Sequence, residues 1–166
     1  MAVFLLSVKS SFRRRQDIRF QVSYKCYILR KVGLCSMNEQ VRVLIADDQQ
    51  PTRQGLMALL SLTSQIEIMA EAINGQEAVL LTEKYHPDVI LMDMKMPVMD
   101  GLQATRLIKN RWPEIKIIGL TIYPNYRTEA IKAGIDTFLL KGCAADVLQS
   151  TILEANSSEA GYAKQR

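Results

Sequence analysis

Cysteine and histidine are scarce in this chain of 166 residues, which contains three cysteines and one histidine. The cysteines, Cys26, Cys35 and Cys143, are widely spaced, and no two of them form a CxxC motif. An odd and scattered set of this kind is not typical of a disulfide framework or of a zinc site, and it favours a reducing cytoplasm. The sequence therefore predicts neither a disulfide-rich miniprotein nor a Cys/His metal centre.

Long hydrophobic runs are also missing. The apolar runs at 43–46, 89–92 and 117–122 have the length of buried strands, and every apolar run falls far short of the ~20 residues that a membrane-spanning helix needs. Hydrophobic residues nevertheless make up 48% of the chain and charged residues 23%, which is ordinary for a globular protein. We therefore expect one domain with short appendages and no membrane span.

Positive charge is concentrated at the start of the chain. Residues 1–37 hold eight Lys or Arg residues and one acid, a formal charge of +7, whereas residues 38–166 carry −3. The net charge of +4 therefore does not indicate that the globular part binds nucleic acid.

Residues 1–36 show no regular apolar period. The apolar run at 2–8 resembles a signal-peptide core, but basic residues follow it rather than precede it, which is the wrong order for secretion. A tether to a membrane surface is an alternative, but the polar start after Met37 favours a disordered basic extension or a mis-called start at 1–36. We expect the domain to occupy 37–156 and a linker or tail to occupy 157–166.

From residue 41 onward, apolar segments of strand length alternate with helical patterns. The predicted strands are Val41–Ala46, Ile66–Ala70, Asp88–Met92, Lys116–Thr121 and Thr137–Leu140. The predicted helices begin at Pro51, at Gly75, after the loop that contains Pro97 and Gly101, at Tyr126 and at Ala144. The first helix has an apolar face of Leu56, Leu59, Leu60 and Leu62, and the last has one of Val147, Leu148, Ile152 and Leu153. This alternation predicts an α/β fold in which helices cover both faces of a five-stranded parallel sheet.

The predicted strands end in residues that carry chemistry. Asp47 and Asp48 follow the first strand, Asp93 the third, Thr121 ends the fourth and Lys141 follows the fifth. In parallel sheets the site lies beyond the carboxyl ends of the strands. Three carboxylates repel one another unless a cation lies among them, and oxygen ligands without His or Cys favour Mg²⁺. One strand-end Asp is commonly only a turn former or helix cap, but four occupied strand ends predict a phosphate and metal site.

Four segments resemble, in order, the receiver domain of two-component response regulators. They are IADDQQPTRQGL at 45–56, VILMDMKMPVMDG at 89–101, GLTIYP at 119–124 and FLLKG at 138–142. The resemblance covers about 41–156 and is strongest to receivers that carry a LuxR-type helix-turn-helix output domain. It implies a (βα)5 flavodoxin-like fold with strand order 2-1-3-4-5. It also implies a switch that receives its phosphoryl group from a sensor histidine kinase.

The resemblance assigns roles by position. It implies that Asp93 is the phosphoacceptor and that Mg²⁺ is bound by Asp93, by Asp48 and by the backbone carbonyl of Lys95, with Asp47 holding the ion through water. It further implies that Lys141 pairs first with Asp93 and then with the phosphoryl oxygens.

The same resemblance implies a switch pair and two residues that tune the phosphorylated lifetime. Thr121 matches the switch hydroxyl, and Phe138, three residues before Lys141, matches the switch aromatic residue. Lys95 and Tyr123 match the residues that flank the path of the hydrolytic water. Because both are bulky, we expect a long-lived phosphorylated state.

Two other classes of protein are alternatives to this interpretation. A metal-dependent phosphohydrolase would also use Asp93 as a nucleophile, but that chemistry usually has a second Asp two residues on, where Lys95 stands. An interaction module with an inactive site disagrees with the complete set of acids. The sequence leaves open a stand-alone receiver or a fragment of a transcription regulator, which would contact DNA only through an output domain not in this chain. Either form allows a homodimer on phosphorylation and acts in the cytoplasm.

Overall fold

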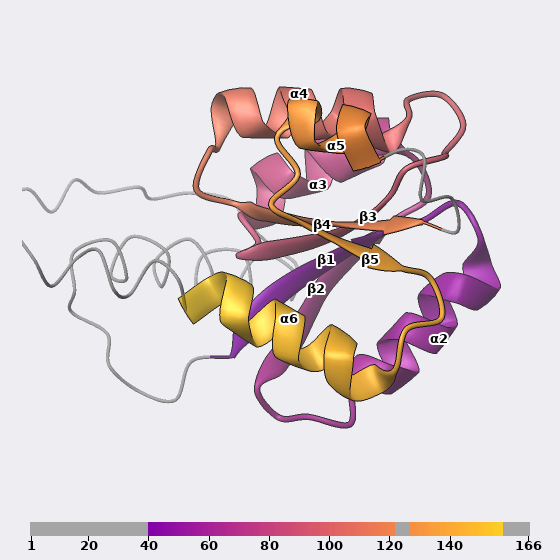
Figure 1. Cartoon of the computed structure of the whole chain (residues 1–166), viewed down its shortest axis with the longest axis vertical. Coiled ribbons are helices and arrows are strands. Elements are labelled where there is room, and N and C mark those ends of the chain that lie inside the picture. Colours follow the sequence, from indigo (N-terminus) through magenta and orange to yellow (C-terminus); the bar gives the residue numbers. More distant parts are fainter. Residues whose placement is uncertain (1–39, 122–126, 158–166) are drawn as a thin grey trace, which may run out of the picture. The chain divides into compact units, whose positions relative to one another are not determined.

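The computed structural model describes residues 40–121 and 127–157, in which five strands alternate with five helices (Figure 1). The strands are β1 (Val41–Ala46), β2 (Ile66–Ala72), β3 (Val89–Asp93), β4 (Lys116–Thr121) and β5 (Thr137–Leu140). The helices are α2 (Gln50–Leu60), α3 (Gly75–Tyr85), α4 (Gly101–Arg111), α5 (Arg127–Ala133) and α6 (Ala145–Ser157).

All neighbouring strands are parallel, and their order in the sheet is β2-β1-β3-β4-β5. This confirms the predicted five-stranded sheet and its 2-1-3-4-5 order. The chain moves outward in one direction from β1 to β2 and in the other from β3 to β5. The reversal lies between β1 and β3, so the site of such a fold is expected at the carboxyl ends of these two strands.

Each face of the sheet carries its own apolar core. Helices α3, α4 and α5 cover one face, and α2 and α6 cover the other (Figure 1). Every residue of β3 is buried, because this central strand is covered on both faces. Ile90 and Met92 of β3 belong to the core beneath α3, α4 and α5, whereas Val89 and Leu91 belong to the core beneath α2 and α6.

The side chains of β2 switch between the two faces of the sheet partway along the strand. Val43 of β1 pairs with Ile68, but Leu44 pairs with Ala70, so Met69 is an extra residue in β2. Ile68 packs with the core beneath α2 and α6, whereas Ala70 packs with the opposite core. A one-residue shift of register thus reverses which side chains of β2 face each helical layer.

Several predicted details differ from the structure. Strand β2 continues two residues beyond its predicted end, to Ala72, and α2 ends at Leu60. Leu62 therefore lies outside the helix and is 77% exposed, so it is not part of the apolar face assigned to it. Val147 in α6 is 43% exposed rather than buried, whereas Leu148 and Ile152 face the core as predicted. No helix among the described residues is long and apolar enough to cross a membrane.

Candidate functional site

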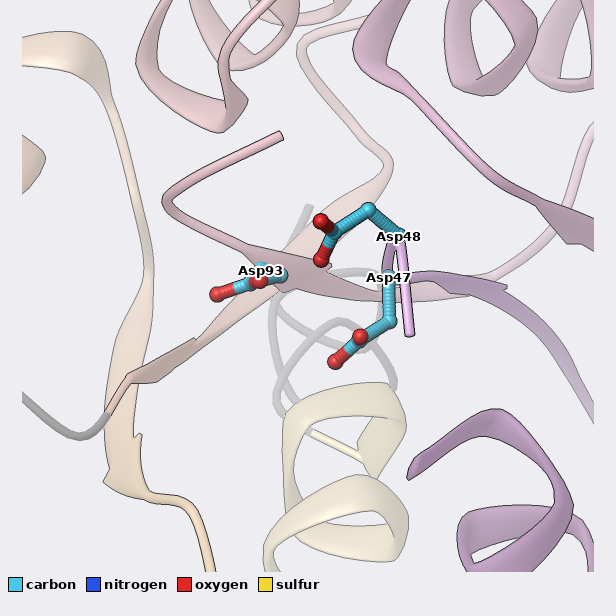
Figure 2. Close-up of side chains that lie close together, drawn as sticks. All are labelled: Asp47, Asp48 and Asp93. Atoms are coloured by element: carbon cyan, nitrogen blue, oxygen red, sulfur yellow. The ribbon is translucent and has the colours of Figure 1, made fainter. Parts of the chain in front are cut away.

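Three carboxylates meet at the carboxyl edge of the sheet. Asp47 and Asp48 follow β1 directly, and Asp93 is the last residue of the neighbouring strand β3. One oxygen atom from each lies within 4.8 Å of the other two, and Figure 2 shows the three side chains gathered between the strand ends. Asp47 and Asp93 are buried, whereas Asp48 is exposed. An oxygen-only set of this geometry suits a hard cation such as Mg²⁺, which retains several waters.

Lys141 supplies the positive charge in this cluster. Its Nζ lies 2.7 Å from Oδ2 of Asp47 and 2.9 Å from Oδ2 of Asp93. The residue follows β5 directly, and its backbone N–H donates a 2.9 Å hydrogen bond to the carbonyl of Thr121 at the end of β4. The sheet therefore fixes the base of the lysine side chain, and the ion pairs link the ends of β1, β3 and β5.

Burial and charge act in opposite directions on the groups in the cluster. Burial raises the pKa of Asp93, more than hydrogen bonding and attraction to Lys141 lower it; the nearby Asp47 carboxylate adds to the rise. Burial alone would lower the pKa of Lys141, but its hydrogen bonds to Asp47 and Asp93 raise that pKa above its ordinary value. The lysine is therefore fully charged at neutral pH, and its charge favours the ionised form of Asp93 against the effect of burial.

Asp47 and Asp48 are held in different ways. Oδ1 of Asp47 accepts a 2.9 Å hydrogen bond from the backbone N–H of Gln49, and its own backbone N–H donates to the carbonyl of Ala72 at 3.1 Å. Together with the Lys141 ion pair, these contacts occupy both carboxylate oxygens of Asp47. Within the described part of the chain, no hydrogen bond or ion pair joins the carboxylate of Asp48.

Backbone hydrogen bonds hold both ends of the loop between β3 and α4, residues 94–100. The backbone N–H of Gly101 donates to the carbonyl of Met94 at 3.2 Å, and that of Gly75 in α3 donates to Met99 at 2.9 Å. A Cβ atom at Gly101 would lie 2.0 Å from the carbonyl oxygen of Asp93, so only glycine fits there. The backbone N–H of Lys95 hydrogen-bonds the Asp93 carboxylate, whereas the lysine side chain is exposed.

The predicted switch residues lie on neighbouring strands. Thr121 is 2% exposed and ends β4, one residue beyond the partner of Asp93 in the register. Phe138 of β5 is half-buried and pairs with Gly119. A Cβ atom at Gly119 would lie only 2.9 Å from the Phe138 ring, so this glycine makes room for the ring beside the sheet.

Tyr123, predicted to tune the phosphorylated lifetime, lies outside the described residues. Conversely, one residue at the site was not singled out from the sequence. Arg53 of α2 donates from Nη1 to the backbone carbonyl of Asp47 at 3.0 Å, and its Nε lies 3.1 Å from the Glu71 carboxylate. Its place in the first turns of the helix that directly follows the acids is the signal that could have identified it.

Comparison with known proteins agrees with this geometry. Residues 43–153 match the response regulator receiver domain family. The chain is 41% identical over 119 residues to the transcriptional regulatory protein DegU of Brevibacillus brevis, covering 68% of this chain and 50% of that protein. It is 34% identical over 124 residues to the response regulator protein VraR of Staphylococcus aureus, covering 74% and 59%. The chain thus spans about half the length of these relatives.

Solved structures give the same result. A DNA-binding response regulator of the LuxR family from Staphylococcus aureus superposes with a TM-score of 0.66 at 34% identity, covering 70% of this chain and 98% of that one. The response regulator domain of Thermotoga maritima CheB superposes with a TM-score of 0.67 at 26% identity, covering 72% and 98%. On its sequence match, its sheet order and its strand-end acids, the chain belongs to the response regulator receiver domain family and resembles the receivers of LuxR-family regulators.

Proposed function

We propose that this chain is a phosphorylation-controlled switch in which Asp93 accepts a phosphoryl group from a sensor histidine kinase. One observation carries the proposal: Asp93 ends the central strand within 2.9 Å of Lys141 and within 4.8 Å of two further carboxylates. A carboxylate oxygen of Asp93 forms the new O–P bond as the N–P bond of the phosphohistidine breaks. The carboxylate is the nucleophile, so the step needs no separate base.

The cluster fits a magnesium ion. Asp48 is exposed with a carboxylate that no described residue engages, which supports its role as a direct ligand. Both oxygens of Asp47 are engaged by Gln49 and Lys141, which supports a contact through water. We propose Asp93 and the backbone carbonyl of Lys95 as the other protein ligands. When bound, the ion neutralises charge on the phosphoryl oxygens.

Lys141 would also neutralise negative charge on the phosphoryl oxygens. Its ammonium lies between Asp47 and Asp93, so a phosphoryl group on Asp93 would bring its oxygens within reach of Nζ. Phosphoryl transfer depends mainly on position and charge, and the sheet fixes the lysine at its backbone through Thr121.

We propose that phosphorylation is read out through Thr121 and Phe138. The hydroxyl of Thr121 would turn toward the phosphoryl group, and the ring of Phe138 would become more buried, so the population shifts toward a second arrangement. The surface formed by α5, β4, β5 and α6 would then change its preference for a partner, which includes a second copy of the chain. Bulk at Lys95 and Tyr123 would slow loss of the phosphoryl group.

We place this switch in the cytoplasm, with transcription as its output. The support is that the relatives are named as transcriptional regulatory proteins and that a LuxR-family match is named as DNA-binding. Contact with DNA would come from an output domain and not from the described residues. The family match favours this switch over the metal-dependent phosphohydrolase that the sequence left as an alternative.

Incubation of the full chain with Mg²⁺ and acetyl phosphate tests the assignment of Asp93. Mass spectrometry should detect one added phosphoryl group that is lost at alkaline pH, as expected of an acyl phosphate. Asp93→Asn should abolish it, whereas Asp146→Asn, which changes an exposed acid of α6, should not. Undiminished labelling of Asp93→Asn would refute the assignment, and steady turnover of a generic phosphate ester would favour the phosphohydrolase.

A further inference from the structure

We propose that Arg53 is a positioning residue for the Asp47–Asp48 acid pair and that Glu71 holds Arg53 in place for this role. The inference rests on the proposed magnesium site, since its consequence is a higher affinity of that site for the ion. Arg53 acts through the backbone between the two acids and does not itself touch the ion or the phosphoryl group.

The contacts of Arg53 are specific and largely shielded from water. Its side chain is 11% exposed, donates from Nη1 to the backbone carbonyl of Asp47 and lies with Nε beside Oε2 of Glu71, at 3.0 Å and 3.1 Å. Two different edges of one planar guanidinium are thus used at the same time. A lysine ammonium could form either contact, but it lacks the rigid fork that makes both in one geometry.

The contact with Asp47 matters because of the peptide that it fixes. The carbonyl of Asp47 belongs to the peptide unit that leads into Asp48, so the orientation of this unit sets where the Asp48 side chain begins. Asp47 has further anchors at its backbone N–H and at both carboxylate oxygens. Asp48 has an exposed carboxylate without a partner among the described residues. Arg53 is therefore the side chain that stabilises the approach to Asp48.

The register shift in β2 explains why Glu71 can reach Arg53. Glu71 pairs with Ile45, which packs in the core beneath α2 and α6, so Glu71 faces the layer that contains Arg53. If the alternation that starts at Ile68 continued through Met69 without the register shift, Glu71 would face the opposite layer. The register shift thus places the Glu71 carboxylate beside α2, the helix that follows Asp47 and Asp48. Bulges beside functional sites are known to redirect side chains in this way.

Glu71 also keeps Arg53 from acting as a competitor. A guanidinium beside three carboxylates would be attracted to them and would occupy the space that a cation needs. Because the Glu71 carboxylate takes Nε, the guanidinium is held against the backbone carbonyl instead. Loss of Glu71 would therefore weaken magnesium binding even though Glu71 is not a ligand.

Calorimetric titration of the full chain with Mg²⁺ tests the proposal. Arg53→Met, which keeps an unbranched apolar stem, should raise the Kd about tenfold, the size of effect that residues supporting metal ligands commonly show. Arg53→Lys should recover part of this loss, and Glu71→Gln should raise the Kd by about threefold, below that range. Glu67→Gln is the matched control, because it removes the same charge from an exposed position at the other end of β2. Its Kd should equal that of the unchanged protein.

A second measurement separates positioning from general destabilisation. In the absence of metal, the ¹⁵N–¹H resonance of Asp48 reports on the peptide whose carbonyl accepts the Arg53 hydrogen bond. This resonance should move in Arg53→Met and in Glu71→Gln but not in Glu67→Gln. A folded Arg53→Met with the original Kd and an unmoved resonance would overturn the proposal. If Arg53→Met does not fold, Glu71→Gln decides in the same way.

The outcomes also distinguish this proposal from the one on which it rests. If the unchanged protein bound no Mg²⁺, the magnesium site itself would fail, and the Asp48 resonance would still decide whether Arg53 holds the peptide. If the unchanged protein bound Mg²⁺ and no variant differed from Glu67→Gln, the site would stand and the role of Arg53 would fall.

Discussion

At the scale of single residues, the site contains strong opposing charges. Asp93 is almost fully buried beside Asp47, and Lys141 is the cation that the described residues place between them. A buried charge is tolerated only when it is paired, and here one ammonium serves two buried carboxylates. The cluster is therefore arranged for an additional positive charge at some cost in stability while none is bound.

The first prediction concerns this cost. In metal-free buffer at pH 7, Asp93→Asn should stabilise the folded chain by about 1 kcal/mol, seen as a rise in Tm of roughly 4 °C. The raised pKa of Asp93 gives the sign: its ionised form is less favourable in the folded chain than in the unfolded one, so ionisation at neutral pH destabilises the fold. The gain should grow as the pH rises above the ordinary carboxyl pKa of about 4 and vanish below it.

Calorimetric melting with EDTA, compared with the exposed-site control Asp146→Asn, measures this effect. A lower Tm for Asp93→Asn at pH 7 would show that its ion pair with Lys141 outweighs its burial. Addition of Mg²⁺ should reverse the order, because the unchanged protein then gains stability from binding and the variant loses a ligand.

The second prediction concerns Gly101, where only a hydrogen atom fits in the place of a side chain. Gly101→Ala would place a methyl group 2.0 Å from the carbonyl oxygen of Asp93, so either α4 or the end of β3 must move. We expect a loss of about 3 kcal/mol or more, measured by urea unfolding, together with slower phosphorylation by acetyl phosphate. Gly55→Ala is the control: nothing lies within 4 Å of its added methyl group, and it should stabilise α2 by about 0.5–1 kcal/mol. Equal stability of the two variants would contradict the close approach.

At the scale of elements, two helices each bury a threonine, and these two threonines differ in whether the hydroxyl group is hydrogen-bonded. Thr82 in α3 donates from Oγ1 to the carbonyl of Ala78 at 2.6 Å, whereas Oγ1 of Thr105 in α4 is buried without a hydrogen-bond partner among the described residues. Both side chains are 0% exposed. Burial of an unpaired hydroxyl is unfavourable, whereas burial of a bonded one is nearly neutral or favourable.

The third prediction uses this contrast. Thr105→Val keeps the shape of the side chain and removes the unpaired hydroxyl, so it should stabilise the protein by about 1 kcal/mol in urea unfolding. Thr82→Val removes a hydroxyl that is bonded and should destabilise it by about 0.5–1 kcal/mol. The opposite signs are the test, because the chemical change is the same. A destabilising Thr105→Val would indicate that its hydroxyl finds a partner in solution, such as a water molecule.

Periodicity and turn residues were sufficient to predict the five strands, their helices and the convergence of the strand-end acids. The short apolar runs of the strands are local signals, because they can be recognised from neighbouring residues alone. Pro51 at the start of a helix and the glycines near helix ends are local signals of the same kind. The register shift at Met69 was not predictable, because it depends on which residues of β2 pair with β1, and the sequence of β2 alone does not reveal this pairing. The exposure of Leu62 and Val147 was missed because it depends on where each helix ends and on what packs against it. The Arg53–Glu71 pair was missed for a related reason, since the shift decides which way Glu71 faces.

At the scale of the whole molecule, the basic stretch of the sequence ends close to where the described core begins. The described core begins at Val41, whereas the strongly basic stretch of the sequence ends before Met37. The residues after 37 carry −3 in total, with acids at the site and mixed charges elsewhere. A net negative charge on this part would weaken non-specific attraction to nucleic acid, as the proposed role of a separate output domain in DNA contact requires.

The fourth prediction follows from this division. A chain that starts at Met37 should melt within a few degrees of the full chain, a difference of less than about 1 kcal/mol, and accept a phosphoryl group from acetyl phosphate at the same rate. The reason is that residues 1–36 show no periodic apolar face, whereas the described core is built from residues 41 onward. Parallel melting curves and labelling time courses would measure this. A large fall in Tm would show that the segment packs on the domain.

The hydrogen bond from Gly75 to Met99 gives the loop after Asp93 a natural reporter of its own opening. The amide proton of Gly75 is buried and bonded to this loop, so it can exchange with deuterium only when the loop separates from α3. Local openings of this kind need less free energy than global unfolding. The exchange rate at one amide, measured before and after phosphorylation, would therefore report the free energy of loop opening at a position that does not touch the acids.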